Sequence, residues 1–162
     1  MFDEDNGFAV GNPVGGQWVL LSTTDGGANW SSAGTLTQNG SELGFNNSMD
    51  WIGSQIGWFG TDNDRVYNTT DGGTTWQSST TTFTNSTTVS FTDEQNGIAS
   101  GDATDRTSDG GLTWSAQSIG DHLLHTPFLW DYDTTYTCGT PELIFKSTNG
   151  GNSWGGKPDQ IH

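Results

Sequence analysis

Two loops in the sequence each place two carboxylates just ahead of an arginine, and these loops could bind a cation or a basic partner. The candidate residues are Asp62, Asp64, Arg65, Asp102, Asp105 and Arg106, with Glu142 in a matching loop further along. Carboxylate oxygens are ligands that Ca²⁺ takes in proteins, so Ca²⁺ is the cation to consider. The alternative is that each Asp starts a tight turn and each Arg pairs with its neighbour at the surface, which stabilises little.

Other residues that could do chemistry have no motif around them. His122 and His125 could bind a metal or transfer a proton, or they could be ordinary loop histidines. Trp51, Trp58 and Trp130 could stack on sugar rings if they are exposed, or they could belong to the core. The sequence therefore assigns no catalytic residue and leaves any metal unknown.

An eight-residue segment occurs four times and predicts the elements that position these loops. Thr-Thr-Asp-Gly-Gly-Ala-Asn-Trp at 23–30 recurs in similar form at 69–76, 107–114 and 147–154. The shared positions are Asp25, Gly27, Trp30, Asp71, Gly73, Trp76, Asp109, Gly111, Trp114, Asn149, Gly151 and Trp154. Successive copies of the acid or amide are 46, 38 and 40 residues apart, a period that fits the four short strands of a propeller blade.

The spacing inside the segment predicts a turn that satisfies its own backbone. The Asp carboxylate is expected to accept turn N–H groups, and Gly supplies the positive φ of the bend. The Trp falls on the returning strand, where its indole can cover the hairpin. Asn149 keeps an acceptor oxygen but loses the charge, so we expect the fourth turn to be held by weaker bonds.

A second repeated element, two short strands around a polar turn that ends in Gly, precedes the first three copies and is degenerate before the fourth. The two elements together predict an all-β propeller with four-stranded antiparallel blades at approximately 1–35, 44–79, 87–117 and 124–155, within one domain spanning 1–162. The innermost strands are expected at 1–3, 48–52, 87–92 and 126–130, and the outermost at 28–33, 74–79, 112–117 and 152–155. In such blades the repeated turns lie on one rim, and the loops with the candidate residues, together with Asn12 and Gln17, lie on the other.

Composition supports an all-β chain and excludes several kinds of partner. Thr, Ser and Asn make up a third of the 162 residues, which suits strands and turns and disfavours helices. The formal charge of −15 excludes a nucleic acid or an anionic membrane surface as the partner. Cys138 is the only cysteine, so the chain has no internal disulfide, and no apolar run is long enough to span a bilayer.

The four segments resemble the Asp-box, or BNR, repeat of β-propellers such as sialidases, the sortilin ectodomain and xyloglucan-degrading glycosidases. The residues Asp3-Glu4-Asp5-Asn6-Gly7-Phe8-Ala9-Val10-Gly11 are most similar to photosystem II assembly/stability factor-like repeats of secreted bacterial proteins. In that family the box determines the fold and lies away from the functional face, so the resemblance implies architecture and not activity. It also implies a secreted, periplasmic or cell-surface protein, and the abrupt start of the sequence is typical of a piece without its signal peptide.

The leading hypothesis is a non-catalytic scaffold or binding module that contacts a protein or a glycan and needs no cofactor. The alternative is a segment of a carbohydrate-active, glycoside hydrolase-type propeller enzyme, whose two facing carboxylates no motif marks in this sequence. A sialidase is disfavoured, because it needs three arginines and the chain has only Arg65 and Arg106. A closed four-bladed ring, a segment of a larger propeller and self-association into a ring are all compatible with the repeats.

Overall fold

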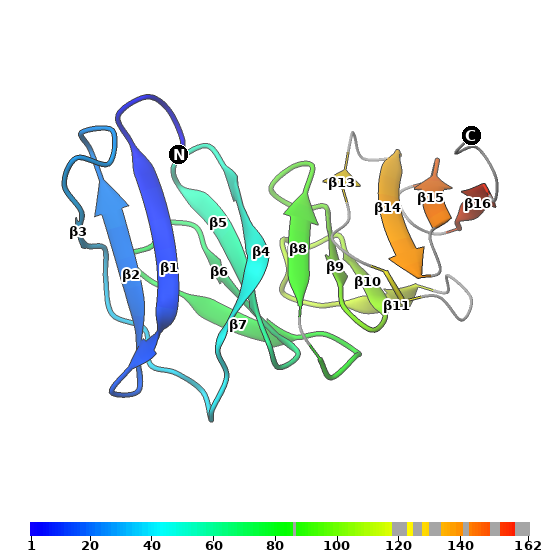
Figure 1. Cartoon of the computed structure of the whole chain (residues 1–162), viewed down its shortest axis with the longest axis horizontal. Coiled ribbons are helices and arrows are strands. Elements are labelled where there is room, and N and C mark those ends of the chain that lie inside the picture. The colour runs from blue at the N-terminus through cyan, green and yellow to red at the C-terminus, as the bar shows by residue number, and fades with distance from the viewer. Residues whose placement is uncertain are drawn as a thin grey trace.

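The computed structural model describes residues 1–85, 87–117, 123–124, 128–129, 134–140, 143–149 and 153–157. The strands in these ranges form four antiparallel sheets that follow one another in chain order along the longest axis of the molecule (Figure 1). None of the described residues is helical, so no helix in this part of the chain could cross a membrane.

Each sheet is built mainly from strands that pair with their neighbours in sequence. The first sheet has the order β1-β2-β3, formed by β1 (Gly7–Val14), β2 (Gln17–Thr23) and β3 (Ser31–Ser32). The second contains β4 (Gly44–Ile52), β5 (Ile56–Thr61), β6 (Arg65–Thr69) and β7 (Gln77–Thr80). The third contains β8 (Thr88–Phe91), β9 (Gly97–Ser100), β10 (Thr104–Thr107) and β11 (Ser115–Gln117). The fourth contains β12 (Leu123–Leu124), β13 (Phe128–Leu129), β14 (Thr135–Thr140), β15 (Leu143–Ser147) and β16 (Gly155–Lys157).

The first sheet lacks its innermost strand, so the prediction of a strand at 1–3 is wrong. The amides of Phe2 and Asp3 donate to the Asn6 carbonyl at 2.7 and 3.4 Å, which closes a turn directly ahead of β1. The outermost strands begin about three residues later than predicted, at Ser31, Gln77 and Ser115. The reason is that the repeated turn extends as far as its Trp before the chain becomes extended.

The turn around Asp71 shows how each repeat closes on itself. Thr69 Oγ1 and the Thr75 amide donate to Asp71 Oδ1 at 2.9 and 2.8 Å, and Thr75 Oγ1 donates to Asp71 Oδ2 at 2.6 Å. The Gly73 amide donates to Thr69 Oγ1 at 3.0 Å, and Gly73 has a φ of 88°, which only glycine adopts freely. Asp25 and Asp109 make the corresponding bonds in the first and third sheets.

The fourth turn makes similar bonds with an amide in place of the carboxylate. Asn149 Oδ1 accepts from Ser147 Oγ at 3.0 Å and from the Ser153 amide at 2.9 Å. Asn149 Nδ2 donates to Ser153 Oγ at 2.9 Å, so this bond runs in the opposite direction to the one between Thr75 and Asp71. The fourth turn therefore keeps its contacts and loses the charge assistance. Gly151 lies outside the described residues.

The repeated turns share one rim with the turns that precede β1, β5 and β9, as the sequence predicted. The amides of Gly26, Gly72 and Gly110 donate to the carbonyls of Asp5, Gln55 and Gln95 at 2.8, 2.9 and 2.9 Å. The loops after β5 and β9 bond instead to the segments that cross between sheets. The rim assignment is therefore confirmed for the first three sheets.

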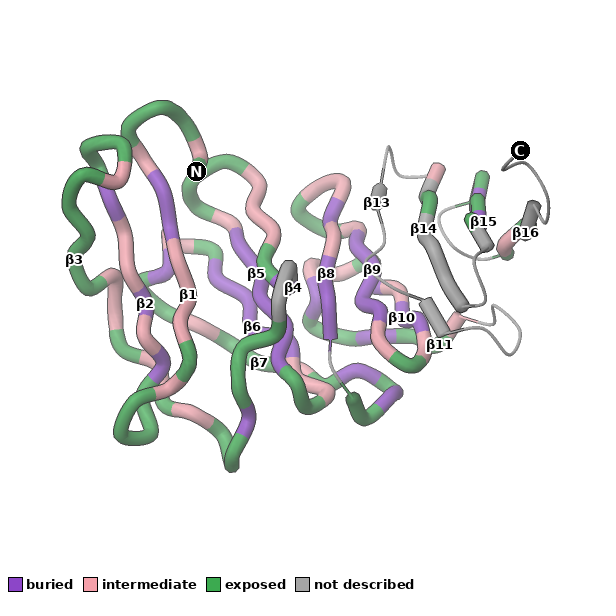
Figure 2. Tube along the Cα trace, in the orientation of Figure 1, coloured by how far each residue is buried: buried purple, intermediate pink, exposed green. Residues whose placement is uncertain are grey.

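The buried apolar side chains among the described residues form two clusters, each shared by neighbouring sheets; Figure 2 marks the buried residues along the strands. Residues of the first and second sheets form one cluster, which consists of Phe8, Trp18, Leu20, Phe59 and Tyr67. A second cluster, mostly from the second and third sheets, consists of Trp58, Val66, Phe83, Val89, Phe91, Ala99 and Trp114. The first and second sheets therefore each bury apolar side chains against the next sheet along the chain.

The tryptophans of the repeated turns pack toward the preceding sheet. The Trp76 ring lies 5.9 Å from the ring of Phe8 in the first sheet, and Trp114 Nε1 donates to Ser79 Oγ of the second sheet at 2.9 Å. Trp30 belongs to the first sheet, which has no sheet before it among the described residues, and its side chain is 40% exposed. The first and fourth sheets lie at opposite ends of the molecule (Figure 1), so the described residues form an open row and not a closed ring.

Replacing Asp71 tests the carboxylate-centred turn. We expect Asp71→Ala to lower the free energy of unfolding by about 1–2 kcal/mol, because the donors of Thr69 and Thr75 lose their acceptor at a partly exposed site. Asp71→Asn is the matched control and should cost less, since Asn149 shows that an amide can make similar contacts. Urea unfolding measures both. Equal losses for the two variants would contradict the proposed role of the carboxylate, and so would an Asn149→Ala variant as costly as Asp71→Ala.

The same carboxylates make stability depend on pH. Hydrogen bonds from Asn29 and from Thr75 hold the pKa values of Asp25 and Asp71 below the ordinary value of 3.8. Because the unfolded chain binds these protons more readily, the stabilisation is complete well above the unfolded-state pKa of 3.8 and is lost as the pH falls from about 4 through the lower folded-state pKa values. Urea titrations across this range should show a shallower acid loss for Asp71→Asn than for the parent chain, since an amide does not titrate there. Parallel curves would show that Asp71 contributes nothing to the acid loss.

Candidate functional site

The loop after β5 is hydrogen-bonded to the segments that cross between sheets. Asp62 Oδ1 accepts from the Leu43 amide at 2.7 Å, and the Asp62 amide donates to the Leu43 carbonyl at 2.9 Å. Asp64 has a φ of 46°, and its carbonyl accepts from the Thr81 amide at 2.8 Å. Asp62 is exposed and Asp64 is half-buried, so only part of this predicted acidic loop is open to a ligand.

Arg65 pairs with a residue that the sequence did not single out. Its Nε lies 3.0 Å from Glu42 Oε2, and the two side chains are 18% and 0% exposed. Glu42 Oε1 also accepts from the Tyr67 hydroxyl and, at 3.0 Å, from the Asn39 amide. Arg65 therefore faces a buried carboxylate of the crossing segment, and the expectation that it pairs with a neighbouring Asp at the surface is wrong.

The Glu42 cluster, which consists of Glu42, Arg65, Tyr67 and Asn39, is built for stability. Burial and the adjacent Glu42 carboxylate raise the pKa of the Tyr67 hydroxyl far above its ordinary value, so this group stays a hydrogen-bond donor. Nothing in the repeat marks Glu42, because the crossing segment at 33–43 has no counterpart of similar sequence in the other sheets. The only feature of the sequence that could have drawn attention to Glu42 is that it is the single charged residue in this segment.

Asp105 is also structural, and the expectation that it lies on an exposed acidic face is wrong. Its side chain is 0% exposed. Asp105 Oδ2 accepts from the Thr82 amide at 2.5 Å, and Oδ1 accepts from Thr82 Oγ1 at 2.7 Å. The carboxylate thus fixes the segment that crosses from the second sheet to the third.

The remaining predicted residues of this rim are dispersed. Asp102 is exposed and accepts from Asn85 Nδ2 at 2.7 Å, and Arg106 is half-buried on β10. Glu142 lies outside the described residues, as do His122, His125 and Trp130. Among the described residues no three His, Cys, Asp or Glu side chains gather in a way that could hold a metal ion. Trp58 is buried and Trp51 is half-buried, and both pack on aromatic rings.

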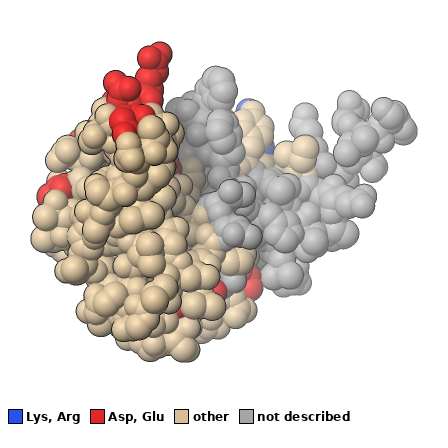
Figure 3. All heavy atoms as spheres, turned by 60° about the vertical axis from the view of Figure 1, so that its left-hand side comes forward, with Lys and Arg blue, Asp and Glu red and all other residues tan. Residues whose placement is uncertain are grey.

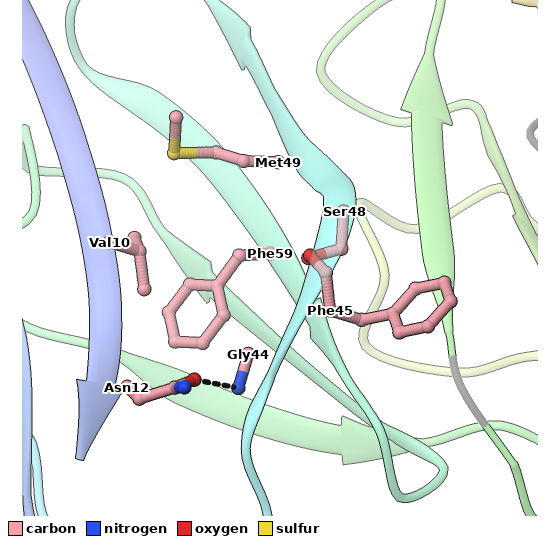
Figure 4. A pocket seen from close by; sticks show the side chains of 7 residues that line it. All are labelled: Val10, Asn12, Gly44, Phe45, Ser48, Met49 and Phe59. Carbon is pink, nitrogen blue, oxygen red and sulfur yellow. Dashed lines mark hydrogen bonds between the residues drawn. The ribbon is translucent and has the colours of Figure 1, made fainter.

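A pocket of about 520 Å³ lies between the first and second sheets, at their inner strands (Figure 4). Its lining residues are Val10, Asn12, Gly44, Phe45, Ser48, Met49 and Phe59. Val10 of β1, Met49 of β4 and Phe59 of β5 point toward a shared space in Figure 4. Asn12 Oδ1 accepts from the Gly44 amide at 2.9 Å and closes one side.

The chemistry of this pocket suits binding and not hydrolysis. No lining residue is acidic, basic or nucleophilic apart from the Ser48 hydroxyl, which donates to the Phe45 carbonyl at 2.5 Å. Glycoside hydrolysis needs two carboxyl groups facing across a cleft, and this lining has none. A lining that combines apolar side chains with polar groups such as Asn12 suits a ligand segment that carries both kinds of group. Of the lining residues, only Asn12 was among the rim candidates predicted from the sequence, and Phe45 and Met49 were missed, although both are apolar residues in a polar stretch.

The Glu42 cluster generates a prediction that separates a coupled buried pair from two independent contacts. Glu42→Met should lower the free energy of unfolding by about 3 kcal/mol, because Arg65 and Tyr67 lose a buried acceptor. Adding Arg65→Met should recover part of that loss, because the unpaired charge is then removed. Urea unfolding of both single variants and the double variant measures the coupling. A loss in the double variant equal to the sum of the two single-variant losses would contradict this coupling.

Comparison with known proteins yields structural relatives only. No protein-family model matches the chain, and no curated protein matches its sequence. A YCF48 structure with a bound D1 peptide superposes with a TM-score of 0.68 at 20% identity, over 96% of this chain and 52% of that one. YCF48 from Cyanidioschyzon merolae gives a TM-score of 0.61 at 16% identity, over 89% and 51%.

Glycoside hydrolase structures of family GH74 are similar to the same degree. An ancestral GH74 enzyme gives a TM-score of 0.62 at 16% identity, over 95% of this chain and 24% of that one. A Niastella koreensis GH74 enzyme gives 0.56 at 19% identity, over 88% and 34%. The chain thus spans about half the length of the two YCF48 structures. These likenesses, together with the row of antiparallel sheets, show that the chain has a β-propeller fold.

Proposed function

We propose that this chain is a non-catalytic binding module that holds a segment of another protein. The observation that carries the proposal is the pocket between β1 and β4, which is lined by four apolar side chains together with polar groups and has no acid or base. Two exposed apolar side chains belong to it, Phe45 at 41% and Met49 at 38% exposure. Large apolar side chains left open beside a pocket are typical of an interaction site.

Two further observations support a protein partner. The YCF48 structure that resembles this chain over 96% of its length holds a peptide. The chain carries a formal charge of −15, and Asp62 and Asp102 remain exposed on the rim where the crossing segments lie. These charges favour a partner with basic residues near its docking segment and disfavour nucleic acid.

The architecture that we propose around this module is an arc of a larger propeller with Asp-box turns, in a secreted or surface-exposed protein. The open row of sheets and the exposed Trp30 support the arc. The hydroxyl, carboxylate and glycine contacts of the turns at Asp25, Asp71 and Asp109 support the Asp-box assignment. In this proposal Ca²⁺ has no part in the pocket, which has no carboxylate.

A carbohydrate-active enzyme is the second candidate function, and the likeness to two GH74 enzymes favours it. In that case the catalytic carboxylates would lie outside the pocket. Hydrolysis of a panel of polysaccharides, followed by reducing-end release, tests this candidate directly. Activity that disappears when Asp62 or Asp102 becomes Asn would replace the binding proposal.

Selection from a displayed library of random peptides tests the binding proposal. We expect selected peptides to bind with dissociation constants of about 1–100 µM, the range of modest interfaces. Met49→Asp should weaken them at least about tenfold by placing a charge beside the apolar side chains of Val10 and Phe59. Leu112→Asp is the matched control, because Leu112 is also apolar, is 53% exposed and lies on a repeated turn outside the pocket. Equal weakening by both variants, or no selected peptide, would overturn the proposal.

A further inference from the structure

Four asparagines of the chain are followed directly by glycine, and such a pair can react with itself. The pairs are Asn6-Gly7, Asn39-Gly40, Asn96-Gly97 and Asn149-Gly150. The backbone nitrogen of the glycine can attack the side-chain amide carbon of the asparagine, and the missing Cβ of glycine leaves that approach open. Whether a pair reacts in the folded protein therefore depends on how firmly the fold holds both residues.

Two of these asparagines are held by an aspartate three residues earlier in the chain. Asn6 Nδ2 donates to both carboxylate oxygens of Asp3, at 3.0 and 2.9 Å, and Asn96 Nδ2 donates to both oxygens of Asp93, at 2.9 and 3.0 Å. The backbone amides of Asn6 and Asn96 donate to the same carboxylates at 2.7 and 2.8 Å. The glycines that follow are the first residues of β1 and β9 and pair with β2 and β10. The side-chain amide and the attacking nitrogen are therefore both restrained.

Asn39 and Gly40 lack these restraints. Both residues are exposed, in the segment that crosses from the first sheet to the second. The Asn39 side chain makes no hydrogen bond with a described residue, and the Gly40 amide donates to none. Gly40 has a φ of 68°, and a Cβ at this position would meet nothing within 4 Å. The space around the pair is therefore open to ring closure and to water.

The turn that contains Asn39 and Gly40 closes on Glu42. The Asn39 backbone amide donates to Glu42 Oε1 at 3.0 Å, and Gln38 Nε2 donates to the Glu42 carbonyl at 2.7 Å. The Glu42 carboxylate cannot follow a shift of the turn freely, because it also accepts from Arg65 and Tyr67. A change in the length of the main chain between positions 39 and 42 therefore acts directly on the Glu42 cluster.

We propose that Asn39 is a site of spontaneous deamidation, which converts it into isoaspartate and aspartate and loosens the attachment of the crossing segment to Glu42. The Gly40 nitrogen loses its proton to a base in the solvent and bonds to Asn39 Cγ, the bond between Cγ and Nδ2 breaks, and Nδ2 leaves as ammonia. Water then opens the cyclic imide at either of its carbonyls. The reaction consumes water, releases ammonia and needs no oxidant or metal, and it is independent of the proposed function.

The two products differ in their effect on the turn. In isoaspartate the main chain runs through the former side chain, which adds one carbon between the Asn39 amide and Glu42, so the bonds that close the turn no longer fit. The aspartyl product keeps the original chain length and adds only a charge at an exposed position. The surface near the first sheet is largely uncharged, with acidic side chains gathered at one end (Figure 3), so we expect weak repulsion of that charge. The isoaspartyl form is therefore the less stable product.

Incubation of the full chain at mildly alkaline pH, followed by mass spectrometry of its proteolytic peptides, tests the site. In the folded protein Asn39 should deamidate at least about tenfold faster than Asn6 and Asn96, because only its pair reacts without local unfolding. In concentrated urea the three asparagines should react at similar rates, since each is followed by glycine. Equal rates at the three positions in the folded chain, or a slower reaction at Asn39, would overturn the proposal.

Two variants separate the chemistry from its effect on the turn. Asn39→Gln keeps the backbone amide that bonds to Glu42 but closes the larger ring far less readily, so its midpoint of urea unfolding should stay constant during incubation while that of the parent chain falls. Asn39→Asp reproduces the new charge without the longer main chain and should unfold at a higher urea concentration than the purified isoaspartyl form. Equal midpoints for these two proteins, or a constant midpoint in the deamidated parent, would overturn the proposed loosening.

Discussion

The fold depends on neighbouring sheets burying their apolar faces against each other, and in the part of the chain that the structure describes the first and second sheets each do so with the next sheet. Phe8 of the first sheet and Trp58 of the second pack on the glycines of the following repeated turn, Gly73 and Gly111. A Cβ at Gly73 would lie 2.5 Å from the Phe8 ring and would clash with it, and a Cβ at Gly111 would lie 3.3 Å from the rings of Trp58 and Trp114 and would crowd both. Trp58 Nε1 also donates to the Gly110 carbonyl at 2.7 Å, so the same contact satisfies a buried polar group. Each of these two repeated turns thus closes a hairpin and also provides the surface on which an aromatic ring of the preceding sheet packs.

Polar residues on the opposite rim also hold neighbouring sheets together, through the segments that cross between them. Asp62 and Glu42 fix the segment that crosses from the first sheet to the second, and Asp105 fixes the next crossing. A buried carboxylate needs donors around it. Asp105 accepts from both the amide and the hydroxyl of Thr82, whereas Glu42 accepts from three separate residues. Residues that look like a cation site in the sequence are therefore committed in part to holding the sheets in order.

The fold itself does not select between binding and catalysis. Structures with TM-scores of 0.68 and 0.62 to this chain include one that holds a peptide and one that is an enzyme. What favours binding is local: a pocket between the first two sheets that has apolar and polar groups in its lining and no acid or base.

The sequence alone determined the all-β architecture, the repeated turns and the rim on which they lie, because these depend on contacts within a few residues. The turn around Asp71 is such a case, because its donors Thr69 and Thr75 lie only two and four positions away in the sequence. The pairing of Arg65 with Glu42, the burial of Asp105 and the pocket at Met49 were decided only by the tertiary structure. Each depends on how a non-repeated crossing segment lies between two sheets, and no period in the sequence carries that information. The strand predicted at 1–3 failed for a local reason, because the amides of Phe2 and Asp3 donate to the Asn6 carbonyl and close a turn there.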